Sequence, residues 1–206
     1  MKIVAISDTH YDEYQLTLPK GDILIHCGDF DIRDLKRLEY INSWFGKLDF
    51  KQIIFIMGNH DIYSEKLSKE SIEAIFTNAI YLENSSITIN GIKIWGSPYT
   101  PIFKNWAYMR SGDELKKLWE TIPNDTDIII THGQPLGIND YVEFSKQNVG
   151  CPFLRDKIKE IKPKYYIGGH LHGANGIYKD ENTIYINCSL MNEKYEITNK
   201  PIELEF

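Results

Sequence analysis

The feature that most constrains the fold is a series of short, almost wholly apolar runs, each followed by a polar loop. The first two runs are KIVAI at 2–6 and DILIH at 22–26, and similar runs occupy 53–57, 127–131 and 164–168. Apolar runs of this length, bounded by turn residues, are typical of strands buried on both faces. We therefore expect these five segments to form the central strands of the fold.

Amphipathic segments separate the apolar runs. Apolar residues recur at spacings of three and four over residues 32–47 and again over 65–77, which predicts two helices. The sequence Ser-Gly-Asp-Glu at 111–114 is a capping box that opens a third helix, ending at Trp119. A fourth helix is predicted over residues 150–161.

The middle and the end of the chain have a different pattern. Residues 79–97 predict three short strands, with Asn90-Gly91 as a hairpin turn. Residues 176–206 again predict strands joined by turns. Because β-α units are mixed with hairpins, we expect an α/β fold of two packed mixed β-sheets flanked by helices. A length of 206 residues fits one domain spanning 1–206.

Polar side chains that are able to bind metals follow each of the five apolar runs. They are Asp8, His10, Asp29, Asn59, His132, His170 and His172. Five of the six histidines lie in these loops, and only His26 lies within a predicted strand, where we interpret it as structural. Ligands bind at the carboxyl ends of strands in open α/β sheets, so loops far apart in sequence can converge on one site.

The ordered set of motifs resembles the calcineurin-like metallophosphoesterase superfamily, from residue 6 to about residue 190. The motifs are ISDTH at 6–10, GDILIHCGDF at 21–30, GNHD at 58–61, THGQPLG at 131–137 and GGHLHG at 168–173. A closer resemblance, to small metallophosphoesterase-domain proteins, rests on GSPYTPIFKNWAY at 96–108, VGCPFL at 149–154 and YINCS at 185–189. The resemblance implies a four-layer α/β/β/α metallophosphoesterase sandwich.

The resemblance also implies how the metal ligands divide. Asp8, His10 and His172 would bind a first metal, and Asn59, His132 and His170 a second. Asp29 would bridge the two. All seven positions carry residues that are competent to bind metal.

The resemblance gives His60 a catalytic role beside the metals. It would stabilise the transition state or protonate the leaving oxygen. Asp61 is expected either to orient His60 by a hydrogen bond or to cap the helix that follows residue 63, and the sequence leaves both alternatives open.

The donor types agree with this chemistry. Carboxylate oxygens and imidazole nitrogens suit Mn, Fe, Co, Ni or Zn, and the lack of a thiolate disfavours a structural zinc site. We expect two divalent metal ions, with manganese favoured. Two metals about 3.5–4 Å apart can clamp a phosphoryl group and lower the pKa of a bound water to about 7, so that a metal-bound hydroxide attacks phosphorus in line.

Substrate contacts are sought in the aromatic segment 95–108. Tyr99 and Trp106 are predicted to stack on a nucleotide base, and the alternative is that these rings only pack the loop over the sheet. Arg110 is our first choice among the arginines for a phosphate clamp. The resemblance favours a small phosphodiester substrate, cyclic nucleotides included, over a phosphoprotein.

Net charge and apolar content exclude some partners. A formal charge of −6 disfavours a long nucleic-acid groove, while a small phosphate ester or nucleotide fits a locally positive metal site. No apolar segment approaches the roughly 20 residues of a membrane span, so we expect a cytoplasmic protein with no membrane partner. The sequence does not determine the oligomeric state. A phosphomonoesterase or phosphoprotein phosphatase, and a non-catalytic scaffold or ligand-binding module, remain as alternatives.

Overall fold

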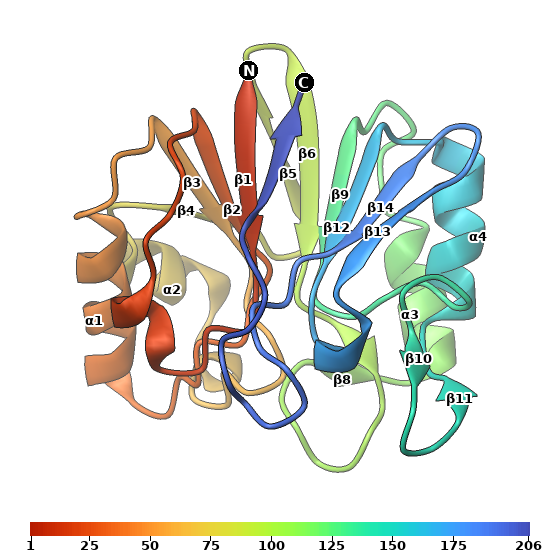
Figure 1. The fold of residues 1–206 in the computed structure, drawn as a ribbon, viewed down its shortest axis with the longest axis horizontal. Helices are drawn as coiled ribbons and strands as arrows, with labels where there is room; N and C mark the ends of the chain where they lie inside the picture. The colour runs from red at the N-terminus through yellow and green to blue at the C-terminus, as the bar shows by residue number, and fades with distance from the viewer.

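The first of two packed sheets contains the N-terminal strands. The computed structural model describes all residues from 1 to 206. The strands of this sheet are β1 (Lys2–Ile6), β2 (Ile23–His26), β3 (Gln52–Phe55), β4 (Ile80–Tyr81) and β15 (Ile202–Glu205). Their order is β15-β1-β2-β3-β4, with β15 antiparallel and the other strands parallel (Figure 1).

The second sheet is built from the remaining long strands. They are β5 (Ser85–Ile89), β6 (Ile92–Ser97), β9 (Ile128–Thr131), β12 (Tyr165–Gly168), β13 (Gly176–Lys179) and β14 (Ile184–Asn187). Their order is β13-β14-β12-β9-β6-β5, with antiparallel strands at both edges. Two short pairs complete the strands: β7 (Thr100–Pro101) with β8 (Met109–Arg110), and β10 (Tyr141–Val142) with β11 (Gln147–Asn148).

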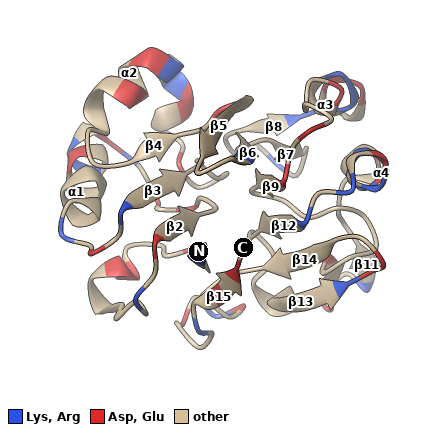
Figure 2. Cartoon of the chain, turned by 90° about the horizontal axis from the view of Figure 1, so that it is seen from above, with Lys and Arg blue, Asp and Glu red and all other residues tan.

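Helices cover the outer face of each sheet, so the structure has the predicted four layers. The helices are α1 (Leu35–Phe45), α2 (Lys69–Ile75), α3 (Gly112–Trp119) and α4 (Pro152–Ile161), with the 3₁₀ turns η1 (Asp12–Gln15), η2 (Ser64–Lys66) and η3 (His172–Ala174). Figure 2 shows α1 and α2 on one side and α3 and α4 on the other, with charged residues mainly on helices and loops. None of the helices reaches the length and apolarity that a membrane crossing needs.

The apolar runs are explained by burial on both faces of each strand. In β1, Ile3 and Ala5 pack between the two sheets, while Val4 and Ile6 pack under the helices. Successive side chains of a strand point to opposite faces, so a strand covered on both sides must be apolar throughout. Strands β2, β9 and β12 are buried at every position in the same way.

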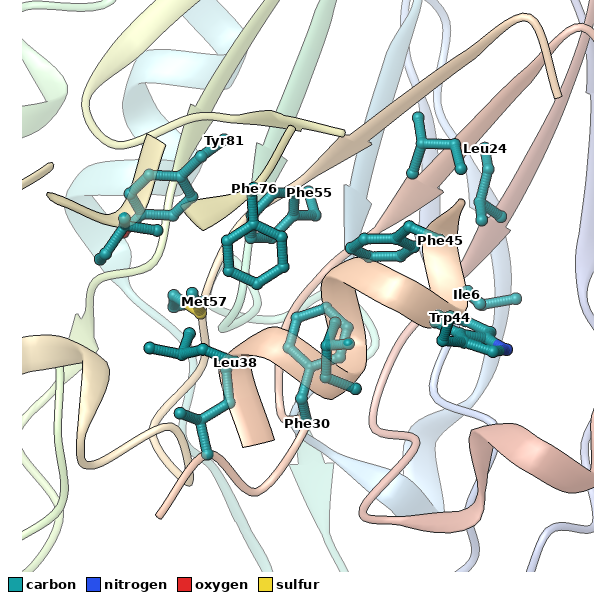
Figure 3. Packing of buried hydrophobic residues seen from close by; sticks show 14 of the residues in the cluster. Ile6, Leu24, Phe30, Leu38, Trp44, Phe45, Phe55, Met57, Phe76 and Tyr81 are labelled. Carbon is teal, nitrogen blue, oxygen red and sulfur yellow. The ribbon is translucent and has the colours of Figure 1, made fainter. Parts of the chain in front are cut away.

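The layer between α1 and the first sheet is rich in aromatic rings (Figure 3). Phe55 of β3 packs against Phe76, with ring centroids 4.4 Å apart, and against Phe45 of α1 at 5.4 Å. These contacts fix α1 on the sheet. They thereby also fix the loop that contains Asp29 and leads into α1.

Two predicted helices are shorter than their apolar pattern. The first begins at Leu35, not at residue 32, because the side chain of Asp34 accepts a hydrogen bond from the Arg37 backbone N–H and caps the helix there. The second is divided into η2 and α2, because Ser68 caps a new helix through the Ser71 N–H. Local hydrogen bonds to the backbone override apolar periodicity at both places.

The carboxyl ends of the parallel strands in both sheets meet along one edge of the molecule. Ser7, after β1, forms an isolated parallel bridge with Ser189, after β14. The Leu190 N–H also donates to the Ser7 carbonyl at 3.0 Å. Loops from the two sheets are therefore joined at the lower end of the molecule in Figure 1.

A buried ion pair ties the first of these loops to α1. Both guanidinium N–H groups of Arg37 donate to Glu13, at 2.6 and 2.8 Å, and Arg37 also donates to the Phe30 carbonyl. Glu13 is 1% exposed, and Arg37 is 8% exposed. The pair thus connects the segment after His10 to the segment after Asp29.

Replacing Glu13 with Ala should destabilise the fold strongly, because it leaves the Arg37 charge buried without a partner. We expect the free energy of unfolding to fall by about 3–5 kcal/mol in urea titrations. As a control, Lys51→Ala breaks the solvent-exposed pair with Asp22 and should change the free energy of unfolding far less. Equal losses in the two variants would contradict this account of the buried pair.

Candidate metal centre

Several of the predicted ligands have a strained backbone. Asp8, His10, Asp29 and His170 have φ angles of 57°, 40°, 61° and 70°. A non-glycine residue in this left-handed region costs on the order of 1–3 kcal/mol, and such strain clusters at functional sites. The turns after β1, β2 and β12 thus have an unfavourable backbone conformation that directs these side chains to one place.

The first group of converging side chains comes from both sheets. Ligand atoms of Asp8, His10 and His172 all lie within 4.8 Å of one another. The Nε2 atom of His172 lies 3.4 Å from Asp8 Oδ1 and 3.3 Å from His10 Nε2. These are the three residues expected to hold the first metal.

The second group contains the remaining candidate ligands. Ligand atoms of Asp29, His132 and His170 lie within 4.8 Å of one another. His132 Nε2 is 2.9 Å from Asn59 Oδ1 and 3.3 Å from Asp29 Oδ2. The same Asp29 oxygen is 3.7 Å from His10 Nε2, in the first group. Asp29 therefore stands between the two groups, as expected for a bridging carboxylate.

Glycines allow the ligand loops to approach one another. A Cβ atom on Gly58 would lie 2.7 Å from the His132 ring and still closer to the Asp29 carboxylate. A Cβ on Gly169 would overlap the side chains of Ser7 and Asp8. The glycines before Asn59 and His170 are thus required by close packing.

Three histidines are oriented through their second ring nitrogen. The Nδ1 atoms of His132 and His172 face the backbone carbonyls of Cys27 and Asn192, at 2.7 and 3.0 Å. A carbonyl only accepts, so each Nδ1 carries a proton, and in the neutral ring each Nε2 presents a lone pair. His10 Nδ1 is 2.9 Å from Asp31 Oδ2 in the same manner. This arrangement is typical of metal-binding histidines.

The resulting lone pairs require a cation. With Nδ1 protonated in both rings, the Nε2 atoms of His10 and His172 face each other at 3.3 Å as two acceptors. The Nε2 atom of His132 likewise faces oxygens of Asn59 and Asp29. Either an added proton or a metal ion must satisfy these atoms, and the donor set fits a pair of divalent ions.

The pKa values show that the site favours positive charge on His132 but not on His170. Burial alone lowers the pKa of His132, but the negative charge of Asp29 raises it to about 10. Burial and the nearby charge of His132 lower the pKa of His170 to about 4, so His170 is neutral at physiological pH. Burial alone raises the pKa of Asp29, but the charge of His132 holds it well below its usual range.

His60 lies beside both groups, and its ring packs edge-to-face on the His10 ring, with centroids 4.8 Å apart. Its backbone N–H donates to Asp29 Oδ1 at 2.8 Å, and its Nδ1 lies 3.4 Å from Asp31 Oδ1. The indole of Trp106 stacks on the His60 ring, with centroids 4.2 Å apart and an interplanar angle of 23°. The structure therefore fixes the His60 imidazole between a carboxylate and an aromatic face.

Asp61 has different partners from either predicted alternative. Its carboxylate accepts four backbone N–H bonds, from Gly58, Asp29, Phe30 and Ile32, at 2.7–3.1 Å. It neither hydrogen-bonds to His60 nor caps a helix. Asp61 instead holds the loop after β3 against the loop after β2, because its carboxylate accepts hydrogen bonds from backbone N–H groups of both loops.

Two of the three side chains predicted to contact the substrate make contacts with other protein residues. Tyr99 donates to Glu83 at 2.9 Å, and the guanidinium of Arg110 lies 4.4 Å above the Tyr99 ring and 3.3 Å from Glu65. These contacts pack the aromatic loop. Only Trp106 contacts a residue of the candidate centre.

Three comparisons place this chain among known proteins. A model of the family described as Calcineurin-like phosphoesterase matches residues 1–174. Human Metallophosphoesterase domain-containing protein 1 is 34% identical over 229 residues, covering 99% of this chain and 70% of the relative. A UPF0046 protein of Caenorhabditis elegans is 34% identical over 217 residues, covering 98% and 74%. A crystal structure that is 15% identical shares the fold, with a TM-score of 0.67 over 94% of this chain and 91% of the other.

The chain belongs to the Calcineurin-like phosphoesterase family. This confirms the predicted family and, with the two packed sheets, the predicted fold class. The seven candidate ligands include two groups that are suited to metal binding.

Sequence reasoning missed several groups around the site. Asp31, which contacts His10 and His60, had one available signal: it follows Asp29 by two residues in the same polar loop. The carbonyls of Cys27 and Asn192 had none, because any residue supplies a carbonyl. Tyr195, whose ring lies 4.9 Å from His10, comes from a segment without a motif.

Metal affinity should increase with pH. In the metal-free protein the stability contributed by the ion pair of His132 with Asp29 is fully present below about pH 6.5 and is lost as the pH rises through about 10, where the His132 ring loses its proton. A metal must displace that proton, so affinity should rise by up to about tenfold per pH unit for each proton displaced. Calorimetric titration with Mn²⁺ at several pH values, in buffers of different ionisation enthalpy, measures both the affinity and the number of protons released. An affinity that does not change with pH, or metal binding without proton release, would contradict this picture.

Proposed function

We propose that this chain is a dinuclear metal-dependent phosphoric ester hydrolase that prefers small phosphodiesters. The single observation that carries the proposal is the position of Asp29 Oδ2, at 3.7 Å from His10 Nε2 and 3.3 Å from His132 Nε2. One carboxylate oxygen within reach of two histidine clusters supports two adjacent metal ions rather than one.

The metals would be held by side chains from both sheets. Asp8, His10 and His172 would hold one ion, and Asn59, His132 and His170 the other. When bound, the two ions would act as Lewis acids on the phosphoryl oxygens and make hydroxide available near neutral pH. The protein then needs no nucleophilic side chain of its own.

His60 is proposed as the group that stabilises the leaving oxygen. Its backbone N–H is fixed on Asp29, so its ring cannot move far from the candidate centre. Asp31 Oδ1 lies 3.4 Å from Nδ1 on one side of the ring, and Trp106 limits rotation of the imidazole. A positioned imidazole of this kind can donate a proton as an ester oxygen departs.

A small diester is favoured over a long polyanion by charge and by the nearby rings. The chain has a formal charge of −6, so attraction of an extended nucleic acid would have to come from the metals alone. Trp106 is half-buried beside His60 and offers an apolar surface to an ester group. A nucleotide base or a simple aryl group would suit that surface.

Hydrolysis of two nitrophenyl esters tests the proposal. With Mn²⁺ added, we expect faster cleavage of bis-p-nitrophenyl phosphate than of p-nitrophenyl phosphate, and loss of both activities in EDTA. Asn59→Ala should abolish cleavage, whereas Asn78→Ala, which removes a hydrogen bond to the end of α1, should leave it unchanged. Preference for the monoester would favour a phosphomonoesterase. No cleavage with metals bound would favour a binding module on the same fold.

His60→Ala should separate chemistry from metal binding. We expect kcat to fall by about 10²–10⁴-fold, because a general acid is lost, while the metal content stays the same. Added imidazole should restore part of the rate if the missing group is the ring itself. An unchanged kcat would remove His60 from the mechanism.

A further inference from the structure

A tyrosine from the last part of the chain lies against the candidate centre. The ring of Tyr195 has its centroid 4.9 Å from that of His10, 5.0 Å from that of His172 and 6.2 Å from that of His60. The contacts with His10 and His172 are edge-to-face. Tyr195 is 50% exposed, so much of its ring remains open on the side away from the histidines.

The loop that carries Tyr195 is organised around one asparagine. The side-chain oxygen of Asn192 accepts the N–H groups of Lys194 and Glu196, at 2.8 and 3.1 Å. A bridge between Met191 and Ile197 closes the base of the loop. The Tyr195 ring is therefore presented by a fixed turn.

The same turn is joined directly to a candidate metal ligand. The backbone carbonyl of Asn192 accepts from the Tyr195 N–H at 3.0 Å and faces His172 Nδ1 at 3.0 Å. Tyr195 has a φ angle of 61°, an uncommon conformation for a bulky residue. The orientation of His172 and the position of the Tyr195 ring thus depend on one carbonyl group.

We propose that Tyr195 is a substrate-positioning residue that contacts the non-leaving ester group of a phosphodiester. This inference rests on the proposed function. Under that function the leaving oxygen would depart toward His60, on which Trp106 stacks. Tyr195 lies nearer to His10 and His172 than to His60, so its open face is next to a different substituent of the phosphorus.

The chemistry of the ring defines the group it would select. An exposed aromatic face favours a planar or apolar substituent, such as an aryl group or a nucleoside base, and stacking on it stabilises binding. A phosphomonoester has no second ester group and gains nothing from this contact. Tyr195 would therefore contribute to the preference for diesters over monoesters.

Binding of two unactivated esters to the Mn²⁺-loaded protein tests the inference without requiring turnover. Tyr195→Ala should weaken binding of diphenyl phosphate by about tenfold and that of phenyl phosphate by less than about twofold, as expected for loss of one stacking contact. Tyr195→Phe should bind both esters like the wild type, because the ring and not the hydroxyl makes the contact. Tyr178→Ala is the matched control, since Tyr178 is 49% exposed on the edge strand β13.

The outcomes separate this inference from the proposed function. Metal content should remain the same in Tyr195→Ala. Equal weakening of both esters, or a loss of metal, would show that Tyr195 only supports the histidines and would overturn the inference. Wild-type protein that binds both esters but cleaves no nitrophenyl ester would instead overturn the proposed function, while selective weakening in Tyr195→Ala would still stand.

Discussion

The site depends on the burial of one carboxylate between two sets of imidazoles. Asp29 is 2% exposed and lies within 3.7 Å of His10 and 3.3 Å of His132. A buried charge is costly unless it is paired. The partners of Asp29 are the His10 and His132 rings, whose Nδ1 atoms are directed to the Asp31 carboxylate and the Cys27 carbonyl. The surrounding structure keeps this arrangement in place. The Asp61 carboxylate accepts four backbone N–H groups from the loops after β2 and β3, and the turn at Asp29 has a left-handed conformation.

Much of the fold follows from the sequence for a clear physical reason. Strands covered on both faces must be apolar at every position, so β1, β2, β9 and β12 are recognisable as continuous apolar runs. The Asn90-Gly91 turn is equally direct, since both residues have positive φ angles, of 51° and 83°, as a tight hairpin requires. Helix ends are less predictable, because a single side chain such as Asp34 or Ser68 can begin a helix against the apolar pattern.

The candidate site likewise has parts that the sequence predicts and parts that it does not. Its seven polar residues are visible in the sequence because each directly follows a strand, and parallel strands bring their carboxyl ends to one edge. What orients them is not visible, since the Cys27 and Asn192 contacts are made by backbone carbonyls. The surroundings of the site are the least predictable part. Tyr99 and Arg110 turn toward Glu83 and Glu65, while Tyr195, whose ring lies against His10 and His172, is more than 80 residues from that aromatic loop.

The most direct test of the account is the number of metal ions that the chain binds. Protein loaded with excess Mn²⁺, freed of unbound ions and analysed by plasma mass spectrometry should contain about two ions per chain. Asp29→Ala should reduce that number, because it removes the oxygen shared by both histidine groups. Electron paramagnetic resonance of the wild type should also show two magnetically coupled Mn²⁺ ions. A single uncoupled ion, or full occupancy without Asp29, would contradict a centre built around this bridging carboxylate.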